Sequence, residues 1–346
     1  MSGFVSARGR RLTARRLIVT LAVCVAGCAA VALIAPLVGV TPDRRFEVLP
    51  LSALGSGSPL HVVFVIRAKQ VAEAVLVGSA AAGAGCALQA LLRNPLADPF
   101  VLGISSGSSL AAVLAIWLGI ERWFGAWGVG GAALVGAVAT LVVVVQLARV
   151  GRGLPPATLL LAGLTISIFC SSASTLVQYL SAFAEQSRML AWLFGGLDPG
   201  RFDSVKYLAI PLVAGLVALV SFARELDALA AGPEVAASLG VAVGRTQNLV
   251  FALASLVVGL AIAIGGPIGF VGLIVPNVLR AIVGPDHRVL LPASLLGGAA
   301  LVVVCDTLAR TLAAPSLLPT GAVTAVLGGP FFVAILIAQK RKAAMW

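Results

Sequence analysis

Residues 93–107 read RNPLADPFVLGISSG, a polar and helix-breaking stretch inside a very apolar sequence. The residues just before it, VLVGSAAAGAGCALQALL, and those that soon follow, SLAAVLAIWLGI, are almost wholly apolar. A residue before proline is pushed out of the α region, so Asn94-Pro95 predicts the end of one helix. Asp98 and Pro99 fit the N-cap and the first position of the next helix. The stretch therefore predicts a turn between two apolar helices.

The composition of the whole chain identifies the setting of this turn. Of 346 residues, 60% are hydrophobic and 11% are charged, and the mean hydropathy is +1.07. A soluble domain carries about 25% charged residues, so we expect an integral membrane protein. The apolar runs are long and do not alternate, which favours spanning helices over a barrel. The net charge of +11 could indicate nucleic acid, but basic residues placed asymmetrically across a membrane explain it better.

The apolar runs predict ten spans in an all-α polytopic protein that forms a single domain, residues 1–346. An even number of spans places both termini on one side of the membrane. Most lysines and arginines fall on that side, Arg93 among them at the membrane boundary, so we expect it to be cytoplasmic. The predicted spans are 17–39, 68–92, 97–119, 126–148, 156–180, 206–223, 244–265, 268–283, 288–312 and 320–338.

The cysteines and the first span raise two further questions. No Cys-x-x-Cys pair occurs, so we expect packing thiols rather than disulfides or metal ligands. The sequence VAGC, ending at Cys28, is similar to a lipoprotein cleavage box. The apolar stretch continues beyond it, which favours an uncleaved first helix. All the cysteines lie in apolar segments: Cys24, Cys28, Cys86, Cys170 and Cys305.

The segment GCALQALLRNPLADPFVLGISSGSS closely resembles the signature of the FecCD permease family, the membrane subunits of ABC importers for iron siderophores, haem and vitamin B12. Four blocks in the last third resemble the family's other motifs in the same order. These are GPIGFVGLIVPNVLR from Gly266, GPDHRVLLPASLLGGA from Gly284, CDTLART from Cys305 and PTGAVTAVLGGPFF from Pro319.

The chain departs from the family pattern at four places. The family usually has Arg-Leu-Pro-Arg before the second span, where this chain has RAKQ, residues 67–70. Asn277 replaces a usual histidine, and Leu317-Leu318-Pro319 replaces Glu-Leu-Pro. Ser109 is the fourth departure. The first bears on partner docking, because one expected arginine is missing, and the third removes an acidic residue from the outer face.

The resemblance implies the type II ABC importer permease fold, with about ten transmembrane helices and both termini cytoplasmic. It implies a homodimer in the cytoplasmic (inner) membrane, two ATP-binding subunits, a periplasmic or extracytoplasmic binding protein, and a metal-chelate substrate. No Gly-Lys-Ser/Thr sequence occurs, so ATP and Mg would be used by the partner ATPase, and this chain would bind no cofactor or metal and catalyse nothing. His61 and His287 are far apart and form no zinc-hydrolase motif.

A polar segment between the sixth and seventh spans, about residues 225–240, is the best candidate for contact with an ATPase. Gly232 suits the end of one short helix, Pro233 the start of the next, and Gly240 the end of the second. The resemblance implies that this is the coupling helix pair. An amphipathic helix pair lying on the membrane is the alternative. The apolar residues expected to fill a groove on the partner are Leu226, Leu229, Val235 and Leu239.

Basic residues at the outer face are candidates for contact with the binding protein. Arg67 and Arg310 match arginines that the resemblance assigns to this contact, and Lys69 is a possible substitute for the arginine that Gln70 replaces. The alternative is that these side chains reach to lipid headgroups. Asp306 lies one helical turn before Arg310 and is a candidate ion-pair partner for it.

Polar residues on the fifth span are candidates for the translocation pathway. At about 100° per residue, four of them fall in one narrow strip, and the family lines its pathway with this helix. Packing of small residues between helices is the alternative. The strip consists of Ser167, Ser171, Ser174 and Gln178.

Two other classes of protein are alternatives to an importer permease. An ion-coupled secondary transporter would need acids embedded in the membrane, and Glu73 and Asp306 are the candidates, both near the outer boundary. A membrane receptor or scaffold would leave the coupling segment and the polar strip unexplained.

Overall fold

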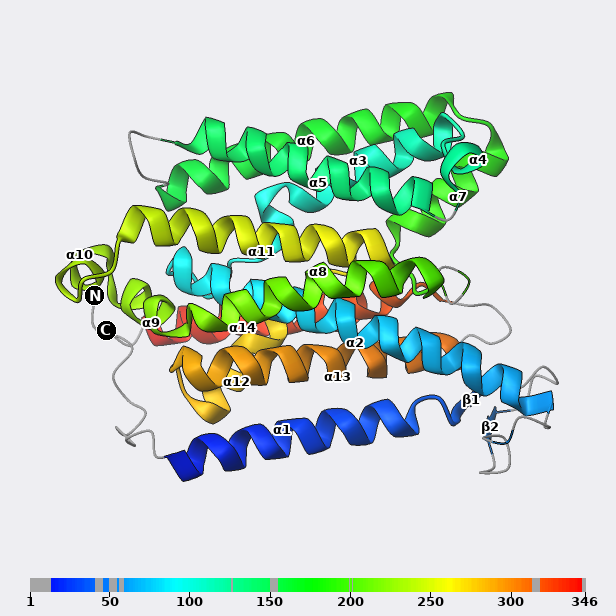
Figure 1. The fold of residues 1–346 in the computed structure, drawn as a ribbon. Coiled ribbons are helices and arrows are strands. Elements are labelled where there is room, and N and C mark those ends of the chain that lie inside the picture. Colours follow the sequence, from blue (N-terminus) through cyan, green and yellow to red (C-terminus); the bar gives the residue numbers. More distant parts are fainter. Residues whose placement is uncertain are drawn as a thin grey trace.

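The computed structural model describes residues 14–40, 46–49, 55, 59–125, 127–149, 155–198, 200, 202–312 and 318–343. The described part is almost entirely helical (Figure 1). Its first half contains α1 (Ala14–Ile34), β1 (Val38–Val40), β2 (Phe46–Val48), α2 (Pro59–Leu91), the 3-10 helix η2 (Pro99–Leu102), α3 (Ile104–Trp117), α4 (Glu121–Phe124), α5 (Trp127–Ala148) and α6 (Pro156–Leu180).

The second half contains α7 (Phe183–Leu193), α8 (Phe202–Ser221), α9 (Ala223–Ala231), α10 (Pro233–Ser238), α11 (Val243–Gly265), α12 (Val271–Val283), α13 (His287–Leu312) and α14 (Thr320–Ala343).

The apolar helices correspond to the ten predicted spans. Among the described residues, six helices are long and apolar enough to cross a membrane: α1, α2, α5, α6, α11 and α13. α8 passes the same test together with α9, which follows it after a bend of 53°. Shorter apolar helices account for the rest: α3, α12 and the segment Thr320–Ile335 of α14.

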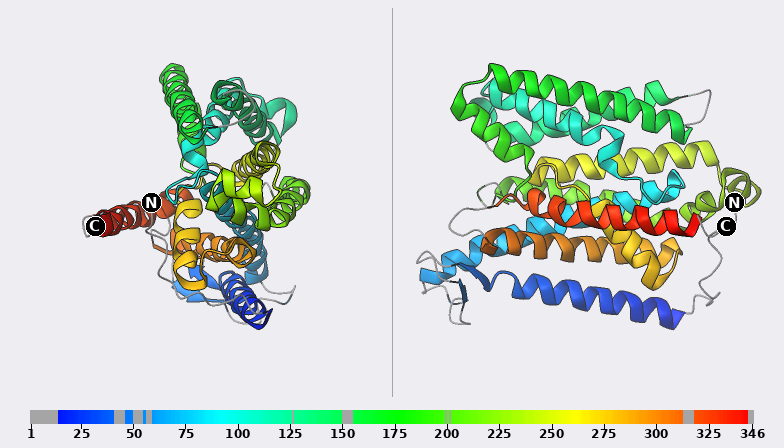
Figure 2. Two further views of the ribbon diagram at one scale, coloured as in Figure 1. Left: turned by 90° about the vertical axis from the view of Figure 1, so that its left-hand side faces the viewer. Right: turned by 180° about the vertical axis from the view of Figure 1, so that it is seen from behind.

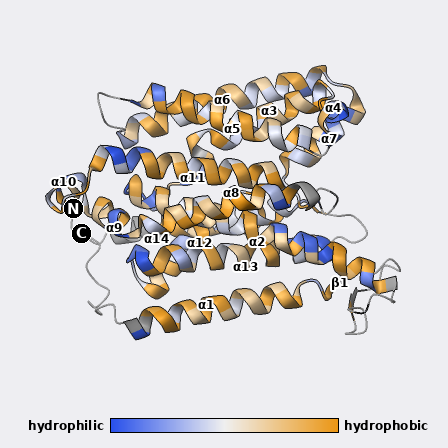
Figure 3. Ribbon diagram, viewed as in Figure 1, coloured by the Kyte–Doolittle hydropathy of each residue, from blue (hydrophilic) through white to orange (hydrophobic). Residues whose placement is uncertain are grey.

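The helices run roughly side by side, and their ends define two faces of the bundle. α1 begins, and α14 ends, at the same face, where α9 and α10 also lie (Figure 1). Hydrophobic residues dominate the helices, and polar residues gather near both faces (Figure 3). The face with α9 and α10 is the cytoplasmic one predicted from the basic residues, and we call it the inner end.

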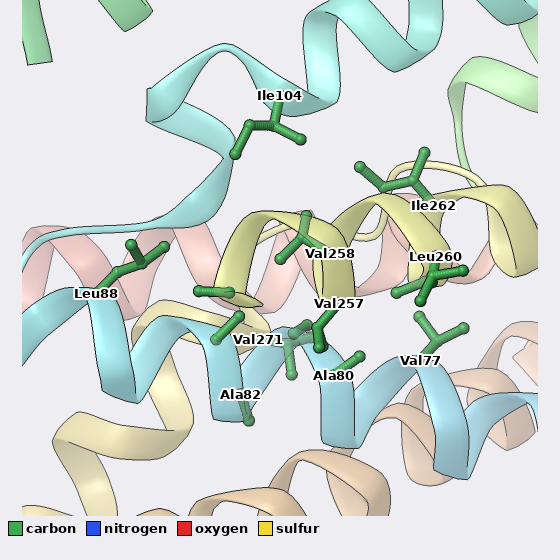
Figure 4. Close-up of a cluster of buried hydrophobic side chains, with 14 of the residues drawn as sticks. Val77, Ala80, Ala82, Leu88, Ile104, Val257, Val258, Leu260, Ile262 and Val271 are labelled. Atoms are coloured by element: carbon green, nitrogen blue, oxygen red, sulfur yellow. The ribbon is translucent and has the colours of Figure 1, made fainter. Parts of the chain in front are cut away.

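α2 is the central helix of the core. It contacts α13, α11, α12 and α8. Figure 4 shows its buried residues, such as Val77 and Leu88, packed with Val258 of α11, Ile104 of α3 and Val271 of α12. Small residues make this packing close. A Cβ added at Gly78 would lie 2.2 Å from the carbonyl oxygen of Gly298 in α13, so the two backbones touch, as small residues allow between helices in lipid.

The structure corrects the prediction of the third span. Asp98 does cap a helix, since its Oδ1 accepts a hydrogen bond from the backbone N–H of Phe100 at 2.8 Å, and Pro99 occupies the first position. The capped helix is the four-residue η2, however, and not the span. Gly103, with φ of 83°, ends η2, and α3 begins only at Ile104.

Some small elements at the outer end have no counterpart in the sequence prediction. β1 and β2 pair antiparallel, with Val38 opposite Val48. α7 follows α6 after a break at Ser181 and Ala182, in the stretch between the fifth and sixth predicted spans. Three-residue strands and a short helix carry too few periodic residues to produce a clear pattern.

The cysteines agree with the expectation of unpaired thiols. All five are free, and Cys86, Cys170 and Cys305 are buried.

Candidate functional site

Two short helices project at the inner end of the bundle, and we call residues 223–240 the inner knob. α9 ends at Ala231 and α10 begins at Pro233. Gly232 between them has φ of 127° and ψ of 152°, a conformation that is essentially restricted to glycine. Gly240, with φ of 84°, follows α10. The predicted order of helix, glycine, proline and helix is therefore confirmed.

Burial divides the apolar residues of the inner knob into two groups. Leu226 and Leu229 of α9 are 0% and 2% exposed, whereas Val235 and Leu239 are 44% and 69% exposed. The expectation that all four side chains would fill a groove on a partner is wrong for Leu226 and Leu229. They pack inside their own chain, because α9 lies against α2, α13 and α8. The apolar side chains available to a partner are those of Val235 and Leu239.

The corner predicted from the signature stretch lies against the inner knob. Arg93 is exposed and has φ of 49°, which is uncommon for a residue other than glycine. A Cβ added at Gly232 would lie 3.9 Å from its Nη1 atom. A cavity of about 240 Å³ lies here and is lined by Leu91, Arg93, Pro155, Pro156, Leu229, Pro233, Val243 and Gln247. Arg93 therefore lies beside the joint between α9 and α10.

Beyond Arg93 the chain turns back into the protein. The side-chain oxygen of Asn94 accepts the N–H of Leu96 at 3.0 Å, and its backbone carbonyl accepts the N–H of Ala97 at 3.0 Å. Asp98 is buried, and residues 98–100 border a small cavity with Val77 and Ala81 of α2. The corner therefore extends from the inner surface to the level of the middle of α2.

A polar network fixes this corner to α12. Asn277 donates from Nδ2 to the carbonyl oxygens of Pro95 and Leu273, both at 2.8 Å. Its side-chain oxygen accepts from Arg280 at 2.9 Å, and Arg280 also donates to Gln89 at 2.7 Å. Asn277, one of the departures from the family pattern, thus uses both N–H groups and its oxygen. Sequence reasoning did not find Gln89 or Arg280, because nothing in a helical pattern indicates contacts across nearly 200 residues.

The candidate docking residues at the outer end are largely covered. Arg67 is 5% exposed, and its Nη1 donates to the carbonyl oxygen of Pro36 at 3.4 Å. The Arg310 side chain is 9% exposed, and its Nε lies 2.9 Å from Oδ2 of Asp306, which confirms the predicted ion pair. The ammonium of Lys69 lies 5.7 Å from the ring centre of Phe202. Contact of these residues with a binding protein stays a prediction.

The polar strip on α6 has an uneven environment. Ser171 is exposed, Ser167 and Gln178 are half-buried, and Ser174 is 5% exposed. α6 packs on α3 and η2, so part of the strip faces the protein. The hydroxyl oxygens of Ser167 and Ser174 are buried and have no hydrogen-bond partner among the described residues. A role of the strip in the pathway stays a prediction.

A cavity of about 290 Å³ opens near the outer end, between α3, α7 and the end of α11. Glu121 of α4 and Arg188 of α7 form an ion pair at its edge, and Trp192 lines it. No group of three or more histidine, cysteine or acidic residues that could hold a metal ion occurs in the part of the chain that the structure describes.

The fold and these sites define a class of protein: a polytopic membrane transport subunit with a short-helix knob at its cytoplasmic end. Residues 21–338 match the model of the FecCD transport family. The chain belongs to this family.

Relatives and a solved structure agree with this assignment. The cobalamin import system permease protein BtuC of Halobacterium salinarum is 40% identical over 275 residues, which cover 80% of this chain and 73% of that protein. The hemin transport system permease protein HmuU of Yersinia pestis is 37% identical over 284 residues, which cover 82% of this chain and 85% of that one.

Among solved structures, a metal-chelate type ABC transporter in an inward-facing conformation has a TM-score of 0.79 and 28% identity, covering 93% of this chain and 99% of that one. The chain is therefore the permease subunit of an ABC importer, with the permease fold expected from the signature stretch.

Proposed function

We propose that two copies of this chain form the membrane path of an ATP-driven importer that carries a metal chelate across the cytoplasmic membrane. The observation that carries the proposal is the inner knob, attached to the core through α9, on a bundle that matches an ABC transporter over nearly its whole length. Val235 and Leu239 present apolar side chains away from the membrane core, where a groove on a separate ATPase would cover them.

The energy for transport would come from ATP that the separate ATPase hydrolyses. The chain has no Gly-Lys-Ser/Thr sequence to cradle phosphates, so ATP and Mg would be bound by the partner. A knob of two short helices suits transmission of movement, since one helix is fixed to the permease and the other projects. ATP binding and hydrolysis would switch the path between outward and inward openings.

The second copy would cover faces that a single chain leaves open. α14 lies at the edge of the bundle when it is viewed end-on (Figure 2). It packs on α12 and α13, and Val326 on it is 73% exposed. α6 is likewise exposed at Leu161 and Phe169. A dimer in which α6 and α14 approach the partner copy would place Ser171 beside a central path.

The proposed substrate class is a metal chelate: a ferric siderophore, haem or a corrinoid. The relatives are named for import of cobalamin and hemin, and their identities to this chain, 40% and 37%, are too close to favour one chelate. An extracytoplasmic binding protein would recognise the chelate and deliver it to the outer end, with Arg67, Lys69 and Arg310 as candidate contacts.

Transport in proteoliposomes tests the proposal. The permease, its ATPase and its binding protein are reconstituted, and uptake of labelled cobalamin, hemin and a ferric siderophore is measured with ATP inside, with and without an ion gradient. We expect uptake of one chelate that needs ATP and the binding protein and does not need the gradient. Uptake driven by the gradient alone would identify a secondary transporter instead. Asp306 is a weak candidate for ion coupling, because its carboxylate is paired with Arg310.

A further inference from the structure

The turn between α12 and α13 holds a polar cluster that the proposed function leaves unused. It reads GPDHR, residues 284–288. Nδ1 of His287 lies 2.7 Å from Oδ1 of Asp227, and the backbone N–H of His287 donates to the same oxygen at 2.8 Å. Asp227 belongs to α9 in the inner knob, 60 residues earlier in the chain. The contact therefore joins the inner knob directly to the start of α13.

The geometry identifies this contact as a helix cap supplied by another helix. The first N–H groups of a helix have no partner within it, and a carboxylate at that end is also favoured by the helix dipole. Asp227 satisfies the N–H of His287, the first residue of α13. Because a carboxylate can only accept, the short contact to Nδ1 places a proton on that nitrogen. Two hydrogen bonds from one residue therefore fix the position of α9 relative to α13.

The neighbours of His287 have other partners. Arg288 donates to Asp286 from Nε at 3.0 Å and from Nη2 at 2.7 Å, and the backbone N–H of Arg288 donates to the same carboxylate. Burial alone would raise the pKa of Asp286, but the hydrogen bonds and charge of Arg288 outweigh it and lower that pKa. Asp286 and Arg288 therefore pair with each other, and Asp227 lies close enough to act on both. His287 makes the two hydrogen bonds that reach Asp227 from the start of α13.

The two side chains of this contact differ in burial. Its side chain is 4% exposed, whereas that of Asp227 is 32% exposed. The second ring nitrogen, Nε2, is buried without a hydrogen-bond partner among the described residues. The imidazole is therefore buried, and among the described residues Asp227 is the only hydrogen-bond partner of its ring.

α13 leads from this contact to the outer end of the molecule. It packs along α2, and near its end Asp306 pairs with Arg310 and accepts a hydrogen bond from Thr320 of α14 at 3.1 Å. One continuous helix therefore connects the inner knob with Arg310 near the outer end and with α14.

We infer that His287 is a positioning residue that holds α9 against α13, so that movement of the ATPase at the inner knob reaches the outer end through α13. This inference rests on the proposed function. It assigns His287 and Asp227 to coupling between ATP hydrolysis and transport, and not to contact with ATP or with the chelate.

The test compares two substitutions in the complete complex. In H287N the amide N–H lies near the position of Nδ1 and keeps the side-chain bond to Asp227. H287L keeps the approximate volume, loses the side-chain bond and retains only the backbone N–H bond. We expect H287N to retain ATP hydrolysis stimulated by the binding protein within about threefold. We expect H287L to lose at least about tenfold of it, while the variant stays folded and keeps its basal hydrolysis and its recovery of the ATPase with the permease.

Asp227 and Arg288 provide the second variant and the control. D227A removes this bond and the cap on the backbone N–H of residue 287 from a partly exposed position, so it tests the inference even if H287L does not fold. The pair H287L/D227A should be no worse than D227A alone. Arg288→Lys, which keeps the positive charge near Asp227 and gives up the two-point contact with Asp286, should behave as wild type. Wild-type stimulation in folded H287L and D227A would overturn the inference, and so would an equal loss of basal and stimulated hydrolysis. Absence of ATP-dependent uptake by the wild-type complex would instead count against the proposed function.

Discussion

α9 and α10 are adjacent in the sequence and similar in composition, but they differ in what they contact. α9 buries Leu226 and Leu229 against the permease core and binds α13 through Asp227. α10 leaves Val235 exposed, and Leu239 follows it with 69% of its surface exposed. One helix is therefore an anchor, and the other is the contact surface that we propose for the ATPase. In the proposed coupling, the fixed helix α9 would pass on to the permease a force that the ATPase applies to α10.

The largest effect on the stability of the permease itself should come from the anchor. Leu226→Ala leaves a cavity at a site with no exposed surface and should cost about 2–5 kcal/mol of unfolding free energy. Unfolding of the purified permease in detergent measures this cost. Val235→Ala, at an exposed position on α10, is the matched control and should change it by less than about 0.5 kcal/mol. Equal costs would show that α9 and α10 are not distinguished by burial.

The joint between the two helices should be next in sensitivity. Gly232→Ala forces a side chain into a backbone conformation that is nearly exclusive to glycine, at a cost of about 1–3 kcal/mol. Gly240→Ala is the control, because the left-handed conformation there costs only about 1–2 kcal/mol and nothing lies within 4 Å of the added Cβ. A larger loss at Gly240 in the same unfolding assay would contradict the assignment of Gly232 as the joint.

The corner at residues 93–99, which lies beside this joint, is held to α12 by the side chain of Asn277. Asn277→Leu removes three hydrogen bonds and leaves the carbonyl of Pro95 without this donor, which should destabilise the permease by about 1–3 kcal/mol. Asn277→His retains a donor and restores the residue usual in the family, so its cost should be smaller. Identical unfolding midpoints for the two variants would mean that the network does not hold the corner.

The smallest effect on the permease itself is expected at the contact surface. Leu239→Asp places a charge on an exposed side chain and should leave the unfolding free energy within about 0.5 kcal/mol of wild type. It should nevertheless prevent recovery of the ATPase with the permease, because docking would bury an unpaired charge. Leu318→Asp, exposed at the outer end, should not affect that recovery. Normal ATPase binding by Leu239→Asp would remove Leu239 from the docking surface.

The sequence predicted the order of the helices and turns but few of the contacts between residues that lie far apart in the same chain. Ten apolar runs, the Asn94-Pro95 corner and the Gly232-Pro233 joint were predictable, because helix length and the backbone limits of proline and glycine are local properties. The break at Gly103 was missed, since Asp98 and Pro99 are equally good at starting a short 3-10 helix and a long α-helix.

Burial was the property least accessible from the sequence. Leu226 and Leu239 look equivalent in a hydrophobic pattern, yet α2 and α13 cover only the first. Arg67 looks like an exposed docking residue in the sequence, but Pro36 and Gly39 lie against its guanidinium in the structure. The partner of His287 was not predictable either, because a bond across 60 residues leaves no periodic signal.

The central claim is that α10 docks on the ATPase while α9 anchors it, and protection of single cysteines tests it most directly. Leu239→Cys and Leu229→Cys are made after the five native cysteines are replaced, and labelling by a soluble thiol reagent is followed with and without the ATPase. We predict that Leu239→Cys reacts rapidly in the permease alone and is protected at least tenfold in the complex, whereas Leu229→Cys is unreactive in both. Equal labelling of Leu239→Cys in the presence and absence of the ATPase would contradict the account.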